Sequence, residues 1–167
     1  MRHSRMLLFL VVLAAPLIVA QAVQPGQVEI KGSANPELIP ERDAYWMLFM
    51  HMADGPRALS RGARAGFIRS SGLADPQIEA VVQAANEYMA SSVQIRSELK
   101  AFLKANPERP MSDRVRAEFD SVAARELAAL ESAIARLRAG LDSEGRWQLK
   151  KFVNSTVKSS MSMMKPD

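Results

Sequence analysis

"DPQIEAVVQAANEYMASSVQIRSELKAFLKA", residues 75–105, is the stretch that decides the fold. Its apolar side chains recur at alternating spacings of three and four residues, which predicts a helix with one apolar stripe. The stripe consists of Ile78, Val81, Ala85, Tyr88, Ser92, Ile95, Leu99 and Phe102. Asp75 is expected to cap the helix, and Asn106 and Pro107 to end it. At ~1.5 Å per residue, this helix is a rod of roughly 45 Å.

A second long helix follows the link "NPERPM", residues 106–111. Ser112 is expected to cap it, and Gly140 to stand just past its end. Its stripe consists of Val115, Phe119, Ala123, Leu127, Leu130, Ile134, Leu137 and Leu141. Because the link is short, the two long helices should be antiparallel neighbours.

Two shorter helices flank this hairpin. Pro40 and the acidic side chains of Glu41 and Asp43 are typical of a helix start, and that helix should run to about Ala53. A last helix should begin near Asp142. Its apolar residues are Leu149, Phe152, Val153, Thr156 and Val157.

A hairpin alone leaves one apolar side open, and the two shorter helices are able to cover it. The sequence therefore predicts an all-α fold, in which a long antiparallel helical hairpin and two shorter helices form a small bundle. Trp46 and Trp147 should both lie near its core. Dimerisation through the long stripe is the competing way to bury the same surface, so a homodimer is an alternative.

Residues 40–160 are expected to form this one helical domain. Residues 23–40 carry three prolines and two glycines without a helical stripe, which indicates an extended or mobile lead-in over residues 23–39. The tail, residues 161–167, is expected to fray.

Residues 1–22 have the three-part layout of a secretory signal peptide. Arg2 and Arg5 form the basic start, residues 6–19 the apolar run, and Ala20-Gln21-Ala22 a small-x-small cleavage site. The run is shorter than the ~20 apolar residues of a spanning helix. We therefore expect cleavage after Ala22 and a secreted or periplasmic protein that is not an integral membrane protein.

Composition narrows the function classes. Loss of Arg2 and Arg5 lowers the formal net charge from +4 to +2, and this modest charge, like the compartment, argues against nucleic acid. The absence of cysteine excludes disulfides, thiol catalysis and thiolate metal sites. Asn154 begins an N-x-S/T sequon, whose use depends on the host.

"AYWMLFMHMAD", residues 44–54, is rich in methionine around one histidine. On a helix Met47, Met50 and His51 share a face, and thioether and imidazole ligands favour Cu(I). This set resembles, in ligand type only, that of the small periplasmic copper chaperones, which are β-barrels. The interpretation we favour is a core helix in which methionine fills irregular gaps, without a cofactor.

"PRALSRGARAGFIRSSG", residues 56–72, is a basic segment without acidic residues. Its arginines are Arg57, Arg61, Arg64 and Arg69. Guanidinium groups bind phosphate and carboxylate well, so an anionic envelope component or an acidic protein surface is a candidate partner. The favoured alternative is a solvated loop that pairs with acids on the long helices, such as Glu79 or Glu87.

"LDSEGRWQLKKF", residues 141–152, resembles the LTxxQ element of the Spy family of periplasmic helical chaperones. Leu141 matches, whereas Asp142 replaces the threonine and Gly145 stands in place of the glutamine. The resemblance covers a dozen residues and implies a chaperone-like role.

Known catalytic patterns are missing from the sequence. After cleavage His51 is the only histidine, and there is no Gly-x-Ser-x-Gly motif or phosphate-binding glycine loop. We therefore expect an exported, non-enzymatic helical binding or interaction protein, either adaptor or chaperone-like. Cu(I) binding and binding of anionic envelope surfaces are the alternatives.

Overall fold

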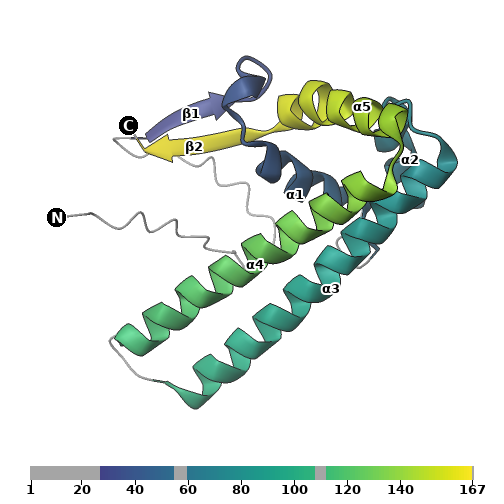
Figure 1. Ribbon diagram of the computed structural model, residues 1–167. Helices are drawn as coiled ribbons and strands as arrows, with labels where there is room; N and C mark the ends of the chain where they lie inside the picture. Colours follow the sequence, from purple (N-terminus) through teal and green to yellow (C-terminus); the bar gives the residue numbers. More distant parts are fainter. Residues whose placement is uncertain (1–26, 55–59, 108–111, 167) are drawn as a thin grey trace.

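The computed structural model describes residues 27–54, 60–107 and 112–166. The elements are, in chain order, β1 (Gln27–Lys31), η1 (Pro36–Leu38), α1 (Glu41–Met52), α2 (Arg61–Arg69), α3 (Asp75–Ala105), α4 (Asp113–Gly140), α5 (Ser143–Phe152), η2 (Val153–Val157), η3 (Lys158–Ser160) and β2 (Ser162–Pro166). The long helices α3 and α4 pack together as an antiparallel hairpin (Figure 1). The predicted fold class, a small all-α bundle built on this hairpin, is confirmed. The signal peptide and its cleavage site lie outside the described residues.

The ends of the hairpin helices follow from local capping. The Ser112 hydroxyl accepts a hydrogen bond from the backbone N–H of Val115 at 3.4 Å, as the sequence suggested. Asp75 is the first helical residue and not the N-cap. The Gln77 side chain instead accepts a hydrogen bond from the backbone N–H of Ala74 at 2.9 Å. Gly140 is the last residue of α4 and does not stand beyond it.

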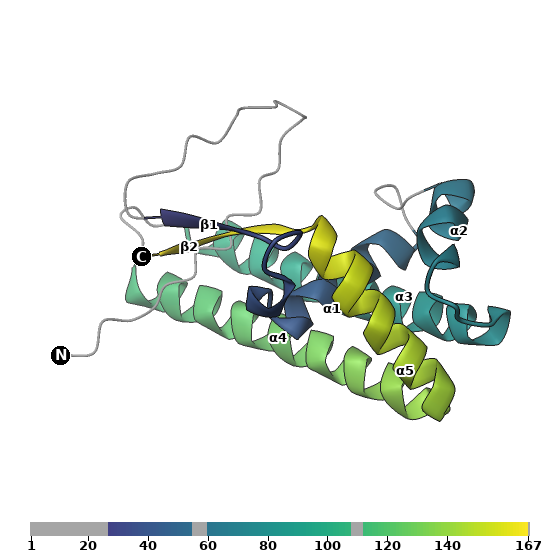
Figure 2. The same ribbon diagram turned by 90° about the horizontal axis from the view of Figure 1, so that it is seen from above.

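Helix α1 forms a middle layer of the bundle. It packs against α3 and α4 on one side and against η2, the continuation of α5, on the other (Figures 1 and 2). Tyr45, Leu48 and Phe49 are at most 1% exposed. Neighbours on two sides explain why this helix has apolar residues around most of its circumference.

A third short helix, α2, was not part of the predicted bundle. Ser60 caps it by accepting a hydrogen bond from Ala63 N–H at 3.3 Å. Phe67 then packs edge-on against the rings of His51 and Phe152, with centroid distances of 5.0 and 5.3 Å. These contacts attach α2 to both α1 and α5.

The lead-in and the tail pair with each other. Strands β1 and β2 form an antiparallel ribbon in which Ile30 stands opposite Met163, and both side chains pack against the core. The backbone N–H of Gly32 donates to the carbonyl of Met161 at 2.8 Å. The lead-in was expected to be extended or mobile, and over β1 it is extended, whereas residues 162–166 of the tail, which were expected to fray, are paired in β2. Each five-residue strand is too short to give a strong alternating pattern, and the ladder forms only because the bundle brings both ends together.

The two tryptophans differ in burial. Trp46 is half-buried and packs against the core, as predicted. Trp147 is 54% exposed, so the prediction of a near-core position is wrong for this residue. The core face of α5 is formed by Leu149, Phe152 and Gly145, and Trp147 lies on the opposite side of the helix.

Candidate functional site

The hydrophobic core ends halfway along the hairpin. Its fully buried members reach Tyr88 on α3 and begin at Leu130 on α4. Beyond this level α1 and α5 no longer cover the hairpin (Figure 1). Val115 and Val122 are buried outside this core, in the part of the hairpin that consists of two helices alone.

A polar network marks the end of the core. The buried hydroxyl of Ser92 donates to the carboxylate of Glu126 at 3.1 Å, and the guanidinium of Arg96 donates to the same oxygen at 2.6 Å. Ser92 is the polar member of the predicted α3 stripe. Its polarity is explained because it meets a carboxylate from the partner helix.

An apolar surface continues past this network. Phe119 and Leu127 on α4 are 38% and 36% exposed, and Ala123 between them is also exposed. Helical spacing places these three residues on the face of α4 that carries the buried Leu130 and Ile134. The predicted α4 stripe is present, but Phe119, Ala123 and Leu127 in its first half are not buried because the short helices do not reach them.

The neighbouring helix adds to this surface. Val93 on α3 is 60% exposed and stands one helical turn after Met89, which packs against the core. We call Val93, Phe119, Ala123 and Leu127 the distal face. It is the candidate binding surface of the hairpin, since exposed apolar residues that gather on one side often mark interaction sites.

Ion pairs hold the hairpin on the side of α4 away from this face. Arg125 on α4 contacts Glu98 on α3 at 2.6 Å and Glu118 at 3.3 Å, and Arg136 contacts Glu87 at 3.2 Å. The hydrogen bond from Arg125 lowers the pKa of Glu98. Such exposed pairs contribute little stability each, but they favour one register of the two helices.

The basic segment is only partly described. Arg57 lies outside the described residues, and for Arg61 the structure describes the backbone in α2. Arg64 is engaged, because its guanidinium donates to the carboxylate of Asp54 at 2.6 Å and to the carbonyl of Met52 at 3.0 Å. Its acid partner is therefore Asp54, not Glu79 or Glu87. Arg69 is exposed. Binding of an anionic partner by this segment stays a prediction.

The methionine–histidine set lies at the edge of the bundle. Met47, Met50 and His51 are each half-buried on one side of α1. The His51 Nδ1 atom is buried and has no hydrogen-bond partner among the described residues. The packing of Met47 against the core agrees with a gap-filling methionine. Cu(I) binding also stays a prediction.

His51 should make stability depend on pH. Burial lowers its pKa from the ordinary value of 6.5. The unfolded chain then takes up the proton first as the pH falls, so the His51 contribution to folding is complete above pH ~6.5 and declines below it. Denaturation curves between about pH 5 and 7.5 should show this decline, and His51→Gln should flatten it. If the free energy of unfolding depended on pH equally in both proteins, His51 would not be the group responsible.

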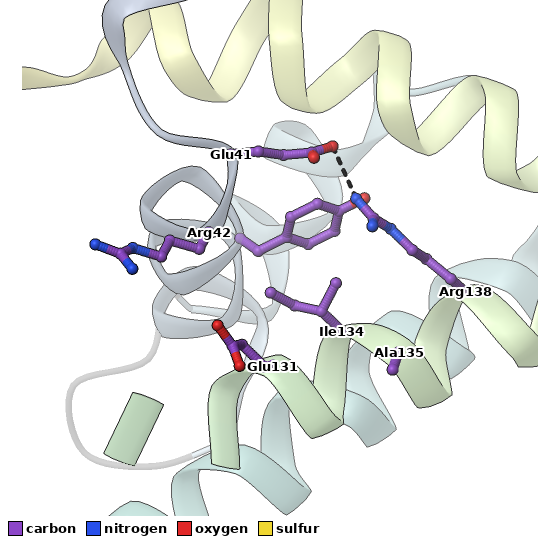
Figure 3. A pocket seen from close by; sticks show the side chains of 7 residues that line it. Glu41, Arg42, Glu131, Ile134, Ala135 and Arg138 are labelled. Carbon is purple, nitrogen blue, oxygen red and sulfur yellow. Dashed lines mark hydrogen bonds and ion pairs between the residues drawn. The ribbon is translucent and has the colours of Figure 1, made fainter. Parts of the chain in front are cut away.

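A shallow depression lies where α1 meets α4 (Figure 3). Its volume is about 250 Å³, and the Glu41 carboxylate pairs with Arg138 at 2.8 Å on its rim. The Arg138 guanidinium also stands 5.0 Å from the centroid of the Tyr45 ring. Burial raises the pKa of Tyr45. These contacts join the start of α1 to α4, and they give Glu41 a structural role.

The sequence matches no protein-family model, no curated protein and no solved structure. Within residues 27–54, 60–107 and 112–166, no three His, Asp or Glu side chains gather to hold a metal ion. No helix in the same ranges is long and apolar enough to cross a membrane.

Proposed function

We propose that this protein is an exported, non-enzymatic helical interaction protein that binds an apolar segment of another protein on the distal face. The observation that carries the proposal is the exposure of Phe119 and Leu127 on a face of α4 that is core elsewhere. The signal-peptide layout of residues 1–22 supports export.

The chemistry of the distal face favours an amphipathic partner. The apolar residues of α4, with Val93 of α3 beside them, form an apolar track that suits a third helix laid along the hairpin. Charged groups of both signs lie at its edge, where Arg96 pairs with Glu126. A partner helix with an apolar face could therefore bind here whether the residues beside that face are acidic or basic. This breadth is typical of an adaptor or chaperone-like protein.

The test compares two pairs of serine substitutions on α4. Phe119→Ser with Leu127→Ser removes the apolar track, whereas Ala124→Ser with Ala128→Ser alters exposed alanines on another side of the same helix. The proteins are produced through their own leader and their masses are determined first. Light scattering then measures how well each suppresses aggregation of an unfolding client protein at near-stoichiometric amounts.

We expect the distal-face variant to need roughly tenfold more protein for equal suppression, a loss of ~1.4 kcal/mol in binding. The alanine-site variant should act like the parent. Equal suppression by all three folded proteins would contradict the proposal. A parent dimer that becomes monomeric in the distal-face variant would assign the face to a second copy instead.

A further inference from the structure

The outer side of α5 carries a second unexplained surface. Trp147 projects from this helix with more than half of its surface exposed, and the residues three and four positions later are Lys150 and Lys151. Residues at these spacings share one side of a helix. The Lys151 ammonium lies over the indole ring, 5.0 Å from its centroid.

The opposite side of α5 is fixed in the core. Leu149 and Phe152 are at most 2% exposed, so α5 cannot turn over to bury its tryptophan. The Lys151 ammonium lies over the indole, and Trp147 is still the most exposed aromatic residue of the described ranges. A large aromatic ring in water is unfavourable by its exposed area, and packing within the fold does not require it here.

The charge of this surface is positive. Helix α5 carries Arg146, Lys150 and Lys151 against the single acid Glu144, and Glu144 is engaged by the side-chain amide of Gln148 at 2.8 Å. Arg146 donates to the carbonyl of Leu141 at 2.5 Å, which leaves the two lysines as the outward cations. We call Trp147, Lys150 and Lys151 the α5 surface.

We propose that the α5 surface binds the headgroup region of an anionic lipid bilayer. Tryptophan prefers the boundary between headgroups and acyl chains, because its ring is apolar and its N–H is polar. Lysines beside it extend their stems along the apolar boundary and place their ammonium groups at anionic headgroups. A soluble polyanion would match the lysines but would leave the indole without a partner, so the ring favours a lipid surface.

The arrangement of the molecule agrees with such contact. Helix α5 lies at the opposite end of the hairpin from the α3–α4 connection (Figures 1 and 2). Docking through α5 would leave the distal face free. This inference is independent of the proposed function, because different residues carry it.

The test measures binding to vesicles of phosphatidylcholine mixed with phosphatidylglycerol, by co-sedimentation and by tryptophan emission. Three variants are compared with the parent: Trp147→Ala, Lys150→Gln with Lys151→Gln, and Lys100→Gln with Lys104→Gln. The last pair removes the same charge from exposed lysines at the far end of α3. All proteins have the same amino terminus, so its contribution to vesicle binding is the same in each of them.

We expect the α5 lysine pair to weaken binding about 25-fold, since each surface lysine contributes a factor of about five. Trp147→Ala should weaken it roughly tenfold and abolish the blue shift of emission on vesicles. The α3 lysine pair and the distal-face serine variant should bind like the parent.

Three results would overturn the proposal. The first is no binding to anionic vesicles by the folded parent. The second is an equal loss of vesicle binding in the α5 and α3 lysine variants, which would mean that the overall charge of the protein, and not the α5 surface, determines binding. The third is binding to a soluble polyanion such as polyphosphate that is as tight as binding to vesicles and unaffected by Trp147→Ala, which would assign the surface to a polymer.

Discussion

Phe152→Ala is expected to lower the free energy of unfolding by about 3–5 kcal/mol. Phe152 is 2% exposed and packs edge-on against Phe67 at 5.3 Å, at the point where α5, α2 and α1 meet. Truncation leaves a cavity between three elements whose backbones are held by other contacts. The surrounding side chains are therefore poorly placed to fill it.

The matched control lies five residues earlier on the same helix. Trp147→Ala removes a larger ring, but from an exposed position. We therefore expect the free energy of unfolding to change by about 0.5 kcal/mol or less. Urea denaturation followed by circular dichroism measures both variants without relying on tryptophan emission. A larger loss for Trp147→Ala than for Phe152→Ala would contradict the described burial of α5.

Gly32→Ala is expected to lower the free energy of unfolding by about 3 kcal/mol, the upper end of ordinary overpacking. A Cβ atom at this buried position would overlap the backbone carbonyl of Lys158 and approach that of Met161. Backbone atoms cannot rotate away as a flexible side chain does. The ribbon must then shift as a whole, and the hydrogen bond from Gly32 to Met161 is weakened.

Gly66→Ala serves as its control, because a Cβ atom there has no neighbour within 4 Å. In the middle of α2 this substitution should stabilise the helix by roughly 0.5–1 kcal/mol. Hydrogen exchange locates the effects: amides of β1 and β2 should lose protection in Gly32→Ala, and those of α2 should gain it in Gly66→Ala. Unchanged strand protection in Gly32→Ala would show that the close approach is not present.

The hairpin could be predicted because its signals are local. The spacing of apolar residues in α3 and the capping hydroxyl of Ser112 act within a few residues of each other, so sequence alone places both helices. The ribbon was missed because β1 and β2 are stabilised by each other from opposite ends of the chain. Neither strand has a strong pattern of its own.

The candidate surfaces were harder to predict, because spacing shows that a stripe exists and not how far a partner helix extends along it. Phe119 and Leu127 fit the α4 stripe as well as Leu130 does, but only Leu130 lies within the part that α1 covers. Trp147 was assigned to the core because the last helix was expected to cover the hairpin, although this residue is out of phase with Leu149 and Phe152. Its position around the helix, opposite Leu149 and Phe152, was the signal that could have predicted its exposure to solvent.

The pairing of β1 with β2 also has a consequence for the time at which the fold is completed. Strand β1 pairs with β2 (Ser162–Pro166), and α1 packs against η2 (Val153–Val157), both much later in the chain. At a synthesis rate of about 5–20 residues per second, α1 is made roughly 5–20 s before the segment that covers its second side. Throughout that interval the apolar side chains on this second side of α1 stay accessible. This side of the nascent chain therefore remains open to targeting factors and holding chaperones until Val153–Val157 is made.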